Sequence, residues 1–499
     1  MDFEKIFPFM CFFLAILIVL MFLPIKNSQT SAIPVTGLVS ANENNYSKQN
    51  VAVLPNFANS DENIAVFSEL NSVPAVLNVP ENPENLVDFG YFSYSKQKNG
   101  FFGVGTYFGK RFSSENFIES EMVFVDSKAQ WAREEFSWDK IEKAEGVFDW
   151  SGVDSSVLFL SKHNVKVLGL IDYGNKWANS NSEVMALPNL EKFERYVKAV
   201  AERYDGDGID DCIGSPVISN WEIWNEENSE RFWKPNPNSE EYAKLLEVAS
   251  KAVKEVNPSS LVVFGGTMGV DGVFIKNVLE KLPANTVDAV AVHPYSLFSS
   301  PESASLKEKL LGLESLNLPI WLTELGWPSS DNGGVLSEEL QANYLSRSFI
   351  ISYSIPFVEK VFWYDFRNDG ENYALFEENF GLVKSDFSEK KAFNSFKELS
   401  VLLNDSSFLG KIVFVNEMDL QAFAFENPQG EKILFLWQLE PNSSSKEIVL
   451  NISNFDFSKA EILDLVNGTK KDLLFEKKDK FSKLNVSVSG NPKVLVLQE

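Results

Sequence analysis

Residues 216–226, PVISNWEIWNE, run from an apolar stretch into two glutamates, Glu222 and Glu226. The β-branched and aromatic residues of this stretch favour a buried strand. Residues 239–256 follow with helical spacing, and a serine and two glutamates at their start are typical of a helix N-terminus. The stretch therefore predicts a strand–helix unit with carboxylates at the carboxyl end of its strand.

Further strand-like runs, apolar, β-branched or aromatic, surround this stretch at 101–108, 130–138, 165–174, 261–267, 288–295, 319–327 and 360–366. Segments with helical spacing alternate with them, which indicates repeated βα units. Together with 216–226 they make eight strands. We therefore predict a (β/α)8 TIM barrel over residues 89–400, a fold that builds its chemistry at the carboxyl ends of its strands.

The pattern changes after the barrel. Short apolar runs separated by turn residues, with almost no helical spacing, lie at 410–416, 420–426, 432–438, 446–452, 460–466 and 493–498. This pattern predicts a C-terminal all-β sandwich over residues 401–499. Residues 25–88 are rich in Asn, Ser and Pro and predict a linker. Two apolar pieces inside it, 63–67 and 72–79, are candidates for extra edge strands.

The N-terminus carries the clearest targeting signal. Residues 6–23, IFPFMCFFLAILIVLMFL, hold no charge and are just long enough to cross roughly 30 Å of hydrocarbon. We therefore predict an N-terminal membrane segment at 1–24, either an uncleaved anchor or a signal segment with small-residue cleavage sites at 30–32 or 39–41. The rest of the chain is then extracytoplasmic, anchored to the membrane by this segment alone, or secreted if the segment is removed.

The composition excludes several classes of function. Seventy acidic and 45 basic residues give a net charge of -25, which disfavours nucleic acid as a partner. With two cysteines and two histidines, the chain has neither a disulfide framework nor a Cys-rich zinc site, and we expect no metal and no cofactor. No G-x-S-x-G elbow is present, which disfavours a serine hydrolase.

The acidic loop at 204–211, YDGDGIDD, is the one stretch with a spacing near that of a calcium loop. Asp205, Asp207 and Asp211 match the middle of that spacing, but Arg203 occupies the first ligand position and the closing glutamate is absent. A Gly/Asp turn after a helix explains the loop equally well.

Two glutamates stand at matching places in the predicted barrel. Glu226 ends the fourth strand, and Glu324 ends the seventh in WLTELGW. Two carboxylates that face each other across a barrel mouth suit glycoside hydrolysis, in which one protonates the leaving oxygen and the other attacks the sugar. This chemistry needs no histidine cluster.

The strand-end motifs Asn225-Glu226 and Thr323-Glu324, with WAREEFSWDKIE at 131–142, resemble clan A retaining glycoside hydrolases. Within that clan the resemblance is nearest to the family 39 β-xylosidase-like group and to enzymes of the family 5 type. It implies that Glu226 is the general acid/base, that Glu324 is the nucleophile, and that Asn225 bonds the sugar 2-hydroxyl. The chain departs from the family pattern at Glu227, where the family often has proline.

Other strand-end residues extend the predicted site. Arg133 near the end of the second strand is a natural partner of Glu324, because a guanidinium lowers a carboxylate pKa. An equal alternative is that it pairs with Glu222, which would be costly if buried alone. His293 and Tyr295 end the sixth strand, and the resemblance implies that one of them contacts the nucleophile. His163 lies at the opposite face and is interpreted as structural.

Four tryptophans, Trp177, Trp224, Trp327 and Trp363, fall at or just beyond predicted strand ends, and flat aromatic walls suit sugar pockets. Trp363 resembles the clan's platform under the cleaved sugar. Trp131 and Trp221 are better explained by core packing.

The sequence thus predicts a retaining glycosidase whose partner is a carbohydrate. A transglycosylase with the same residues is one alternative. A carbohydrate-binding surface protein that kept the barrel and lost turnover is another, since fold alone does not guarantee activity.

Overall fold

The computed structural model describes residues 51–54, 85–111, 123–179, 183–330, 336–414 and 416–499. The predicted membrane segment at 1–24 and the candidate strands at 63–67 and 72–79 lie outside these residues. Across the described residues, no helix has both the length and the hydropathy that a membrane crossing requires.

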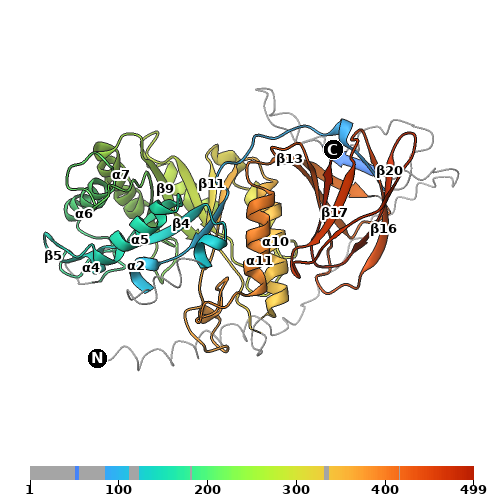
Figure 1. Cartoon of the computed structure of the whole chain (residues 1–499). Helices are drawn as coiled ribbons and strands as arrows, with labels where there is room; N and C mark the ends of the chain where they lie inside the picture. The colour runs from blue at the N-terminus through green and yellow to red at the C-terminus, as the bar shows by residue number, and fades with distance from the viewer. Residues whose placement is uncertain (1–50, 55–84, 112–122, 180–182, 331–335, 415) are drawn as a thin grey trace, which may run out of the picture. The chain divides into compact units, whose positions relative to one another are not determined.

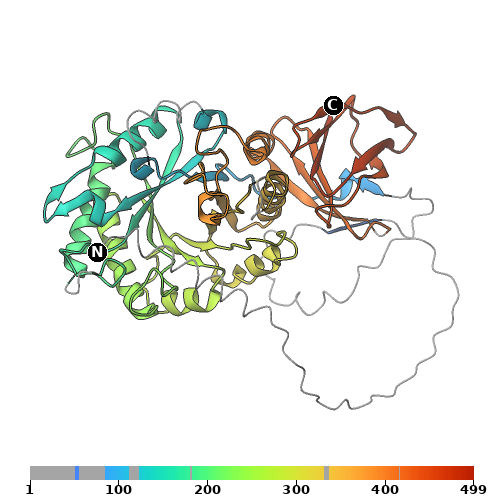
Figure 2. The same ribbon diagram turned by 90° about the horizontal axis from the view of Figure 1, so that it is seen from below.

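A closed barrel of parallel strands forms the first part of the described chain (Figures 1 and 2). Its members, in order around the barrel, are β3 (Phe102–Gly105), β4 (Trp131–Ser137), β7 (Lys166–Asp172), β8 (Asn220–Asn225), β9 (Leu261–Met268), β10 (Ala289–His293), β11 (Ile320–Leu325) and β12 (Val358–Trp363). Each overlaps one of the eight predicted strands, so the predicted barrel is confirmed, with strand ends shifted by a few residues.

Helices follow the barrel strands in the chain and surround them (Figure 2). They are α2 (Phe108–Arg111), α5 (Ser151–Lys162), α6 (Leu190–Arg203), α7 (Ser239–Val256), α8 (Gly272–Leu279), α9 (Leu306–Leu311), α10 (Glu338–Tyr353) and α11 (Lys391–Leu402). The predicted helix at 239–256 coincides with α7, and the side chain of Asn238, one residue earlier, caps it by accepting from the N–H groups of Glu240 and Glu241.

The barrel interior is filled by side chains and is not a pore. One buried cluster joins residues of six strands: Trp131, Leu168, Val263, Ala289, Ala291, Trp321 and Phe362. Trp221 is also buried, in the main hydrophobic core, so both tryptophans predicted to pack in the core do so. This packed interior gives the strand ends a rigid base.

The C-terminal region is a two-sheet β-domain. A seven-stranded sheet has the order β1-β13-β14-β15-β21-β17-β18, and a four-stranded sheet has the order β19-β20-β16-β2. Strands β13 (Ser407–Phe414), β14 (Leu420–Glu426), β15 (Lys432–Gln438), β16 (Lys446–Ser453), β17 (Lys459–Asp464) and β21 (Lys493–Gln498) match the six predicted ones. The extra all-β domain is therefore confirmed.

Three strands of the β-domain were not predicted. These are β18 (Lys470–Asp472), β19 (Phe475–Lys477) and β20 (Ser482–Val488). The first two are short and largely exposed, so no apolar pattern marks them. The third alternates buried and exposed side chains through Leu484, Val486 and Val488, and strict alternation would have identified it.

The predicted linker at 25–88 is wrong at two places. Residues Val51–Leu54 form β1, which pairs antiparallel with β13, and Leu86–Asp88 form β2, which pairs parallel with β16. Both strands cover outer strands of the β-domain sheets that would otherwise present unpaired backbone groups. Extra edge strands therefore exist, but they are different segments from those predicted.

The outer face of the seven-stranded sheet shares a hydrophobic core with α10 and α11. Tyr353 of α10 packs edge-on against Phe425 of β14, with ring centroids 5.6 Å apart. Arg347 of α10 is fully buried and donates to the carbonyl oxygens of Gln438, Leu439 and Gly490. The helix that follows β11 is therefore bonded directly to the β-domain.

Candidate active site

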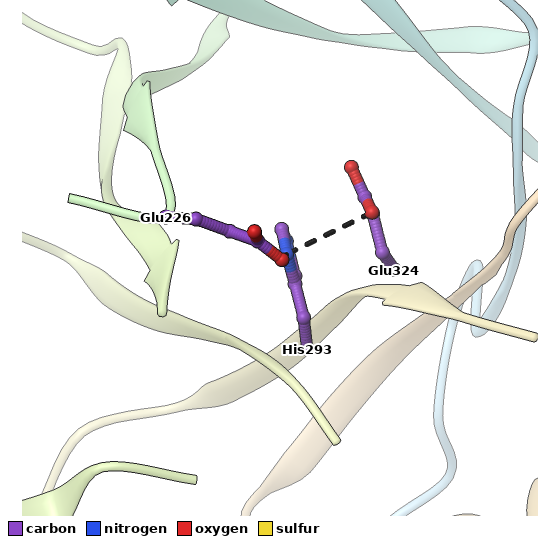
Figure 3. Close-up of side chains that lie close together, drawn as sticks. All are labelled: Glu226, His293 and Glu324. Atoms are coloured by element: carbon purple, nitrogen blue, oxygen red, sulfur yellow. Dashed lines mark hydrogen bonds and ion pairs between the residues drawn. The ribbon is translucent and has the colours of Figure 1, made fainter. Parts of the chain in front are cut away.

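Glu226 and Glu324 converge at the carboxyl ends of β8 and β11 (Figure 3). One carboxylate oxygen of each and one ring nitrogen of His293 all lie within 4.8 Å of one another. The side chains of Glu226 and Glu324 are 9% and 12% exposed, so both are largely removed from water while remaining accessible. The predicted juxtaposition of these two carboxylates is present in the structure.

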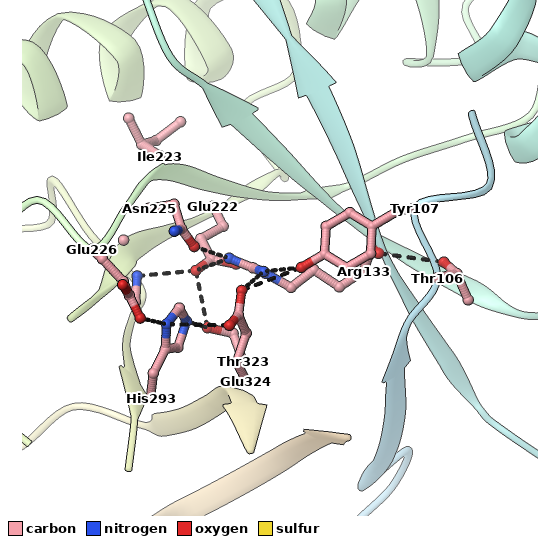
Figure 4. A network of polar contacts seen from close by, with 12 residues as sticks. Thr106, Tyr107, Arg133, Glu222, Ile223, Asn225, Glu226, His293, Thr323 and Glu324 are labelled. Carbon is pink, nitrogen blue, oxygen red and sulfur yellow. Dashed lines mark hydrogen bonds and ion pairs between the residues drawn. The ribbon is translucent and has the colours of Figure 1, made fainter. Parts of the chain in front are cut away.

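The backbone at the end of β8 explains how neighbouring residues enter the same site. Trp224 has φ 71° and Glu226 has φ 52°, both in the left-handed region that side chains rarely adopt. The regular alternation of strand side chains therefore fails here. Asn225 and Glu226 both reach the site, together with Glu222 (Figure 4), and the Glu226 N–H donates to Gly266 O at 2.9 Å. Such strain is found where surrounding contacts enforce it, often at functional sites.

Arg133 joins the two sides of the site (Figure 4). Its Nε lies 2.7 Å from Glu222 Oε2, and its Nη1 lies 2.6 Å from Glu324 Oε1. The sequence predicted the pairing of Arg133 with Glu324 and its pairing with Glu222 as alternatives, and the structure contains both. Nη2 also donates to Asn225 Oδ1 at 2.9 Å, which fixes the orientation of that amide.

Glu324 is held by donors on both of its oxygens. Oε1 accepts from Arg133 and, at 3.2 Å, from the Tyr107 hydroxyl, while Oε2 accepts from the Tyr295 hydroxyl at 2.9 Å. Burial alone would raise the pKa of Glu324, but the charges of His293 and Arg133 and the Tyr295 hydrogen bond lower it below its ordinary value. These contacts therefore favour the ionised form of Glu324.

Glu226 has a different environment. Its Oε1 lies 3.0 Å from His293 Nδ1, and no lysine or arginine forms an ion pair with it among the described residues. The other ring nitrogen of His293, Nε2, lies 3.0 Å from Thr323 Oγ1. The ring is packed so closely against β9 that a Cβ at Gly266 would lie 2.0 Å from Nε2, so this position requires glycine. His293 thus contacts Glu226, while Tyr295 contacts Glu324.

Tyr107 was missed by the sequence reasoning. It lies just after β3, with φ 51°, and its hydroxyl contacts Glu324 and accepts from Arg133 Nη1 at 3.1 Å. The buried Glu134 carboxylate holds this turn by accepting from the Phe108 and Gly109 N–H groups at 3.0 and 3.3 Å. The strand-end argument used for the other strands would have identified Tyr107 had it been applied to the first.

Trp363 does not occupy the predicted place under a sugar. Its side chain is fully buried, its Nε1 donates to Phe380 O at 3.1 Å, and its ring stacks on Trp327. The next residue, Tyr364, is partly exposed, and its ring packs edge-on against Tyr107 and Tyr295 with centroids 6.0 and 6.2 Å apart. The direction of the chain at the end of β12 therefore turns Tyr364 toward the site.

The remaining strand-end tryptophans are also structural. Trp224 and Trp327 are buried, and their indole N–H groups donate to Phe232 O and Ser296 O at 2.9 and 2.7 Å. Trp177 is half-buried and donates to Glu142 O at 3.1 Å. Fixed indoles of this kind are parts of the core and its rim.

Glu227, where the chain departs from the family pattern, is fully buried behind Glu226. Neither of its carboxylate oxygens has a hydrogen-bond partner in the described part of the chain. Burial, together with the nearby charges of Glu222, Glu226 and Asp271, raises the pKa of Glu227 well above its usual range. Burial without a partner therefore favours the neutral form of this carboxyl.

The acidic loop at 204–211 is held by its own backbone. Asp205 accepts from the Asp207 N–H at 3.0 Å, and Asp207 accepts from the Ile209 N–H at 2.8 Å. Asp211 accepts from the N–H groups of Gly206 and Gly208. Asp205 and Asp207 thus form successive Asx turns. One carboxylate oxygen of each of Glu202, Asp205 and Asp207 also lies within 4.8 Å of the others, so both the turn and the calcium interpretation stay predictions.

Comparisons with known proteins find similarity to glycoside hydrolases. Residues 224–386 match the family model described as "Glycosyl hydrolase catalytic core", a span that contains both Glu226 and Glu324. The chain is 27% identical over 219 residues to a β-xylosidase of Geobacillus stearothermophilus, covering 38% of this chain and 43% of that protein. It is 22% identical over 222 residues to endo-1,4-beta-xylanase 5 of Arabidopsis thaliana, covering 41% of this chain and 37% of that protein.

Both alignments span less than half the length of the curated relative. Among solved structures, a family 39 glycoside hydrolase from Bacteroides cellulosilyticus WH2 has the same fold, with a TM-score of 0.64 and 23% identity over 80% of this chain and 81% of that one. The match to a glycosyl hydrolase core confirms the expected class of catalytic domain. The chain is similar to the clan A glycoside hydrolases near family 39, as its strand-end motifs predicted.

Proposed function

We propose that the protein is a retaining glycosidase that hydrolyses O-glycosidic bonds of oligo- or polysaccharides, with Glu226 as the acid/base and Glu324 as the nucleophile. The observation that carries this proposal is the approach of the two carboxylates, whose nearest oxygens lie within 4.8 Å of each other. In retaining enzymes the carboxyl groups are about 5–5.5 Å apart, whereas inverting enzymes need roughly 6.5–9.5 Å to admit a water between them and the sugar.

The division of roles follows from charge. Glu324 is bonded to Arg133 and Tyr295 and has a lowered pKa, which suits a group that must attack as a carboxylate. Burial raises the pKa of Tyr295 well above its usual range, so its hydroxyl remains a donor. Within the described part of the chain, Glu226 contacts the His293 imidazole and forms no ion pair with a guanidinium, which suits a group that must carry a proton.

In the first step a Glu324 oxygen forms a bond to the anomeric carbon, the bond to the leaving oxygen breaks, and Glu226 gives that oxygen its proton. In the second step Glu226 takes a proton from water, the water oxygen bonds the anomeric carbon, and the ester to Glu324 breaks. Asn225 Oδ1 accepts from Arg133, and its amide group also bonds the Tyr173 hydroxyl, which leaves an N–H for a sugar hydroxyl. Tyr364 replaces Trp363 as the aromatic surface beside the reacting sugar.

The names of the relatives favour a β-xylosidic substrate. One curated relative is a β-xylosidase and the other a xylanase, so β-linked xylose is the first substrate to try. The extracytoplasmic location, with anchoring through residues 6–23, is part of the same proposal and rests on the apolar sequence there. Product analysis with an added acceptor sugar separates hydrolysis from transglycosylation.

The test is turnover by the purified full-length protein on a panel of aryl β-glycosides: xyloside, glucoside, galactoside, mannoside and arabinoside. We expect release of the aryl alcohol from at least one of them, with the β-anomer as the first sugar product by NMR. Glu324→Ala should abolish turnover of every substrate. Glu226→Ala should spare substrates with good leaving groups, and equal loss on good and poor leaving groups would contradict its role as the acid.

A further inference from the structure

A continuous line of hydrogen bonds runs from Arg133 to the acid/base residue (Figure 4). Arg133 contacts Glu222, Thr323 Oγ1 lies 2.9 Å from Glu222 Oε1, and His293 Nε2 lies 3.0 Å from Thr323 Oγ1. The line ends where His293 Nδ1 lies 3.0 Å from Glu226 Oε1. Each side chain between the ends has two polar neighbours, so the direction of each bond constrains the next.

Glu222 fixes the direction in which hydrogen bonds are donated along this line. Its two oxygens receive Arg133 Nε at 2.7 Å, Arg133 Nη2 at 3.1 Å, the Gly266 N–H at 3.0 Å and the Thr323 hydroxyl at 2.9 Å. A carboxyl surrounded by four donors, two of them from a permanent cation, is an ionised acceptor with no proton to give.

The Thr323 hydroxyl has one proton, and that proton is directed to Glu222. Its oxygen is therefore an acceptor toward His293, so Nε2 of the imidazole must carry a hydrogen. If neutral His293 carried its hydrogen on Nδ1 alone, its unprotonated Nε2 would face Thr323 Oγ1. Neither atom would then have a hydrogen to donate to the other. Two states then place a proton between His293 Nδ1 and Glu226 Oε1: neutral His293 with protonated Glu226, or cationic His293 with ionised Glu226.

We propose that Thr323 fixes the tautomer of His293, so that His293 Nδ1 and Glu226 Oε1 share one proton, and that Thr323 is thereby a positioning residue for the acid/base. The catalytic role of Thr323 rests on the proposed function. The tautomer of His293 does not, because it can be measured without turnover. In both allowed states the pair holds one proton to deliver to a leaving oxygen. Once that proton is gone, two acceptors face each other at 3.0 Å, which favours recovery of a proton from water in the second step.

The groups around His293 are consistent with this arrangement. Glu226 of the β8 end faces Nδ1, and Glu324 of β11 has its Oε2 3.8 Å from the same nitrogen. Tyr295 packs edge-on with ring centroids 6.4 Å apart, and Glu222 acts through Thr323. On β9 the ring meets Gly266, which brings no charge.

The direct test is nitrogen NMR of full-length protein labelled with 15N-histidine. The chain has two histidines, His163 and His293, so a His163→Gln variant assigns both. We expect His293 to carry hydrogen on Nε2 at every pH at which the protein is folded. A neutral His293 with hydrogen on Nδ1 alone in the wild-type protein overturns the proposal.

Kinetics supply the second test, with Thr323→Val removing the hydroxyl and Thr323→Ser retaining it. Without an acceptor at Nε2, neutral His293 moves its hydrogen to Nδ1 and donates to the Glu226 carboxylate, which stabilises the ionised acid. We expect the basic limb of the pH profile to move down by about one unit, as the loss of one hydrogen bond implies. Rates on poor leaving groups should fall about tenfold and those on nitrophenyl glycosides little.

Thr323→Ser should restore both the tautomer and the basic limb. If His293 keeps its hydrogen on Nε2 in Thr323→Val, the proposal is overturned. It is also overturned if the basic limb of the pH profile does not shift in that variant. Failure of the proposed function looks different, because Glu324→Ala would then leave turnover unchanged while the NMR result stands.

Discussion

Nη1 of Arg133 lies 2.6 Å from Oε1 of Glu324, in a contact between a side chain that is fully buried and one that is 12% exposed. The same guanidinium also neutralises Glu222, so one cation serves two carboxylates. Ion pairs removed from water are screened little by salt, and removing one partner leaves an uncompensated buried charge. Glu222 and Glu324 therefore share the same arginine as their ion-pair partner.

Arg133→Lys should reduce kcat/KM by roughly 10- to 1000-fold, since a lysine cannot bond Glu222, Glu324 and Asn225 together and each charged hydrogen bond is worth about 1.5–3 kcal/mol. Because the pKa of Glu324 is lowered in the wild-type protein, its activity should persist below the ordinary pKa of a glutamate and fail on further acidification. The variant should lose activity at a higher pH. The exposed Arg195→Lys is the control and should behave as the wild type. If the acid limbs of the pH profiles of wild type and Arg133→Lys coincide, Arg133 does not lower the pKa of Glu324.

Tyr107→Phe should lower kcat by about ten- to a hundredfold, the range for loss of one hydrogen bond to a charged group. The ring would remain packed against Tyr364, so the thermal unfolding midpoint should stay close to that of the wild-type protein. Steady-state kinetics on the best aryl glycoside is the measurement. Tyr94→Phe, which removes a hydroxyl bonded to Glu426 of the β-domain, is the matched control and should retain full activity.

Glu227→Gln should stabilise the fold at neutral pH and leave it unchanged in acid. The raised pKa of Glu227 means that the unfolded chain ionises near pH 4.5 while the folded protein retains the proton, so stability falls as pH rises above that value toward the folded pKa. The amide cannot ionise, so this loss disappears in the variant. Denaturant unfolding at pH 4 and pH 7 measures the difference.

The exposed Glu230→Gln is the control for that experiment and should follow the wild type at both pH values. A Glu227→Gln variant that is no more stable than wild type at pH 7 would show that the buried carboxyl does not hold its proton there.

Arg347→Met should lower the free energy of unfolding by about 3–5 kcal/mol, because it removes the hydrogen bonds of a buried cation to backbone carbonyls. Gln438 O and Leu439 O lose this donor, while Gly490 O keeps the one from Asn343 Nδ2. Arg195→Met, which breaks an exposed pair with Glu145, should leave the unfolding midpoint close to that of the wild type. Calorimetric melting of both variants is the comparison. Similar midpoints would mean that the bonds between α10 and the β-domain contribute little to stability.

Much of the barrel could be predicted from the sequence because its strands are buried on both faces. Apolar runs such as those that begin β9 and β10 indicate buried strands directly, and the carboxyl ends of parallel strands meet at one face. That alone brings Glu226 and Glu324 together, with Arg133, His293 and Tyr295 around them. Strands β18 and β19 have no such burial and left no pattern to read.

What the sequence by itself determined is therefore the set of strands and the chemical types at their ends. The tertiary structure decided which of those side chains turn inward: Trp363 is buried and Tyr364 lies beside the site, Arg133 bonds both carboxylates, and Tyr107 completes the donors to Glu324. The physical reason is the backbone. Left-handed residues such as Trp224, at φ 71°, redirect the chain at a strand end, and only the packing and hydrogen bonds of distant segments can hold such strain.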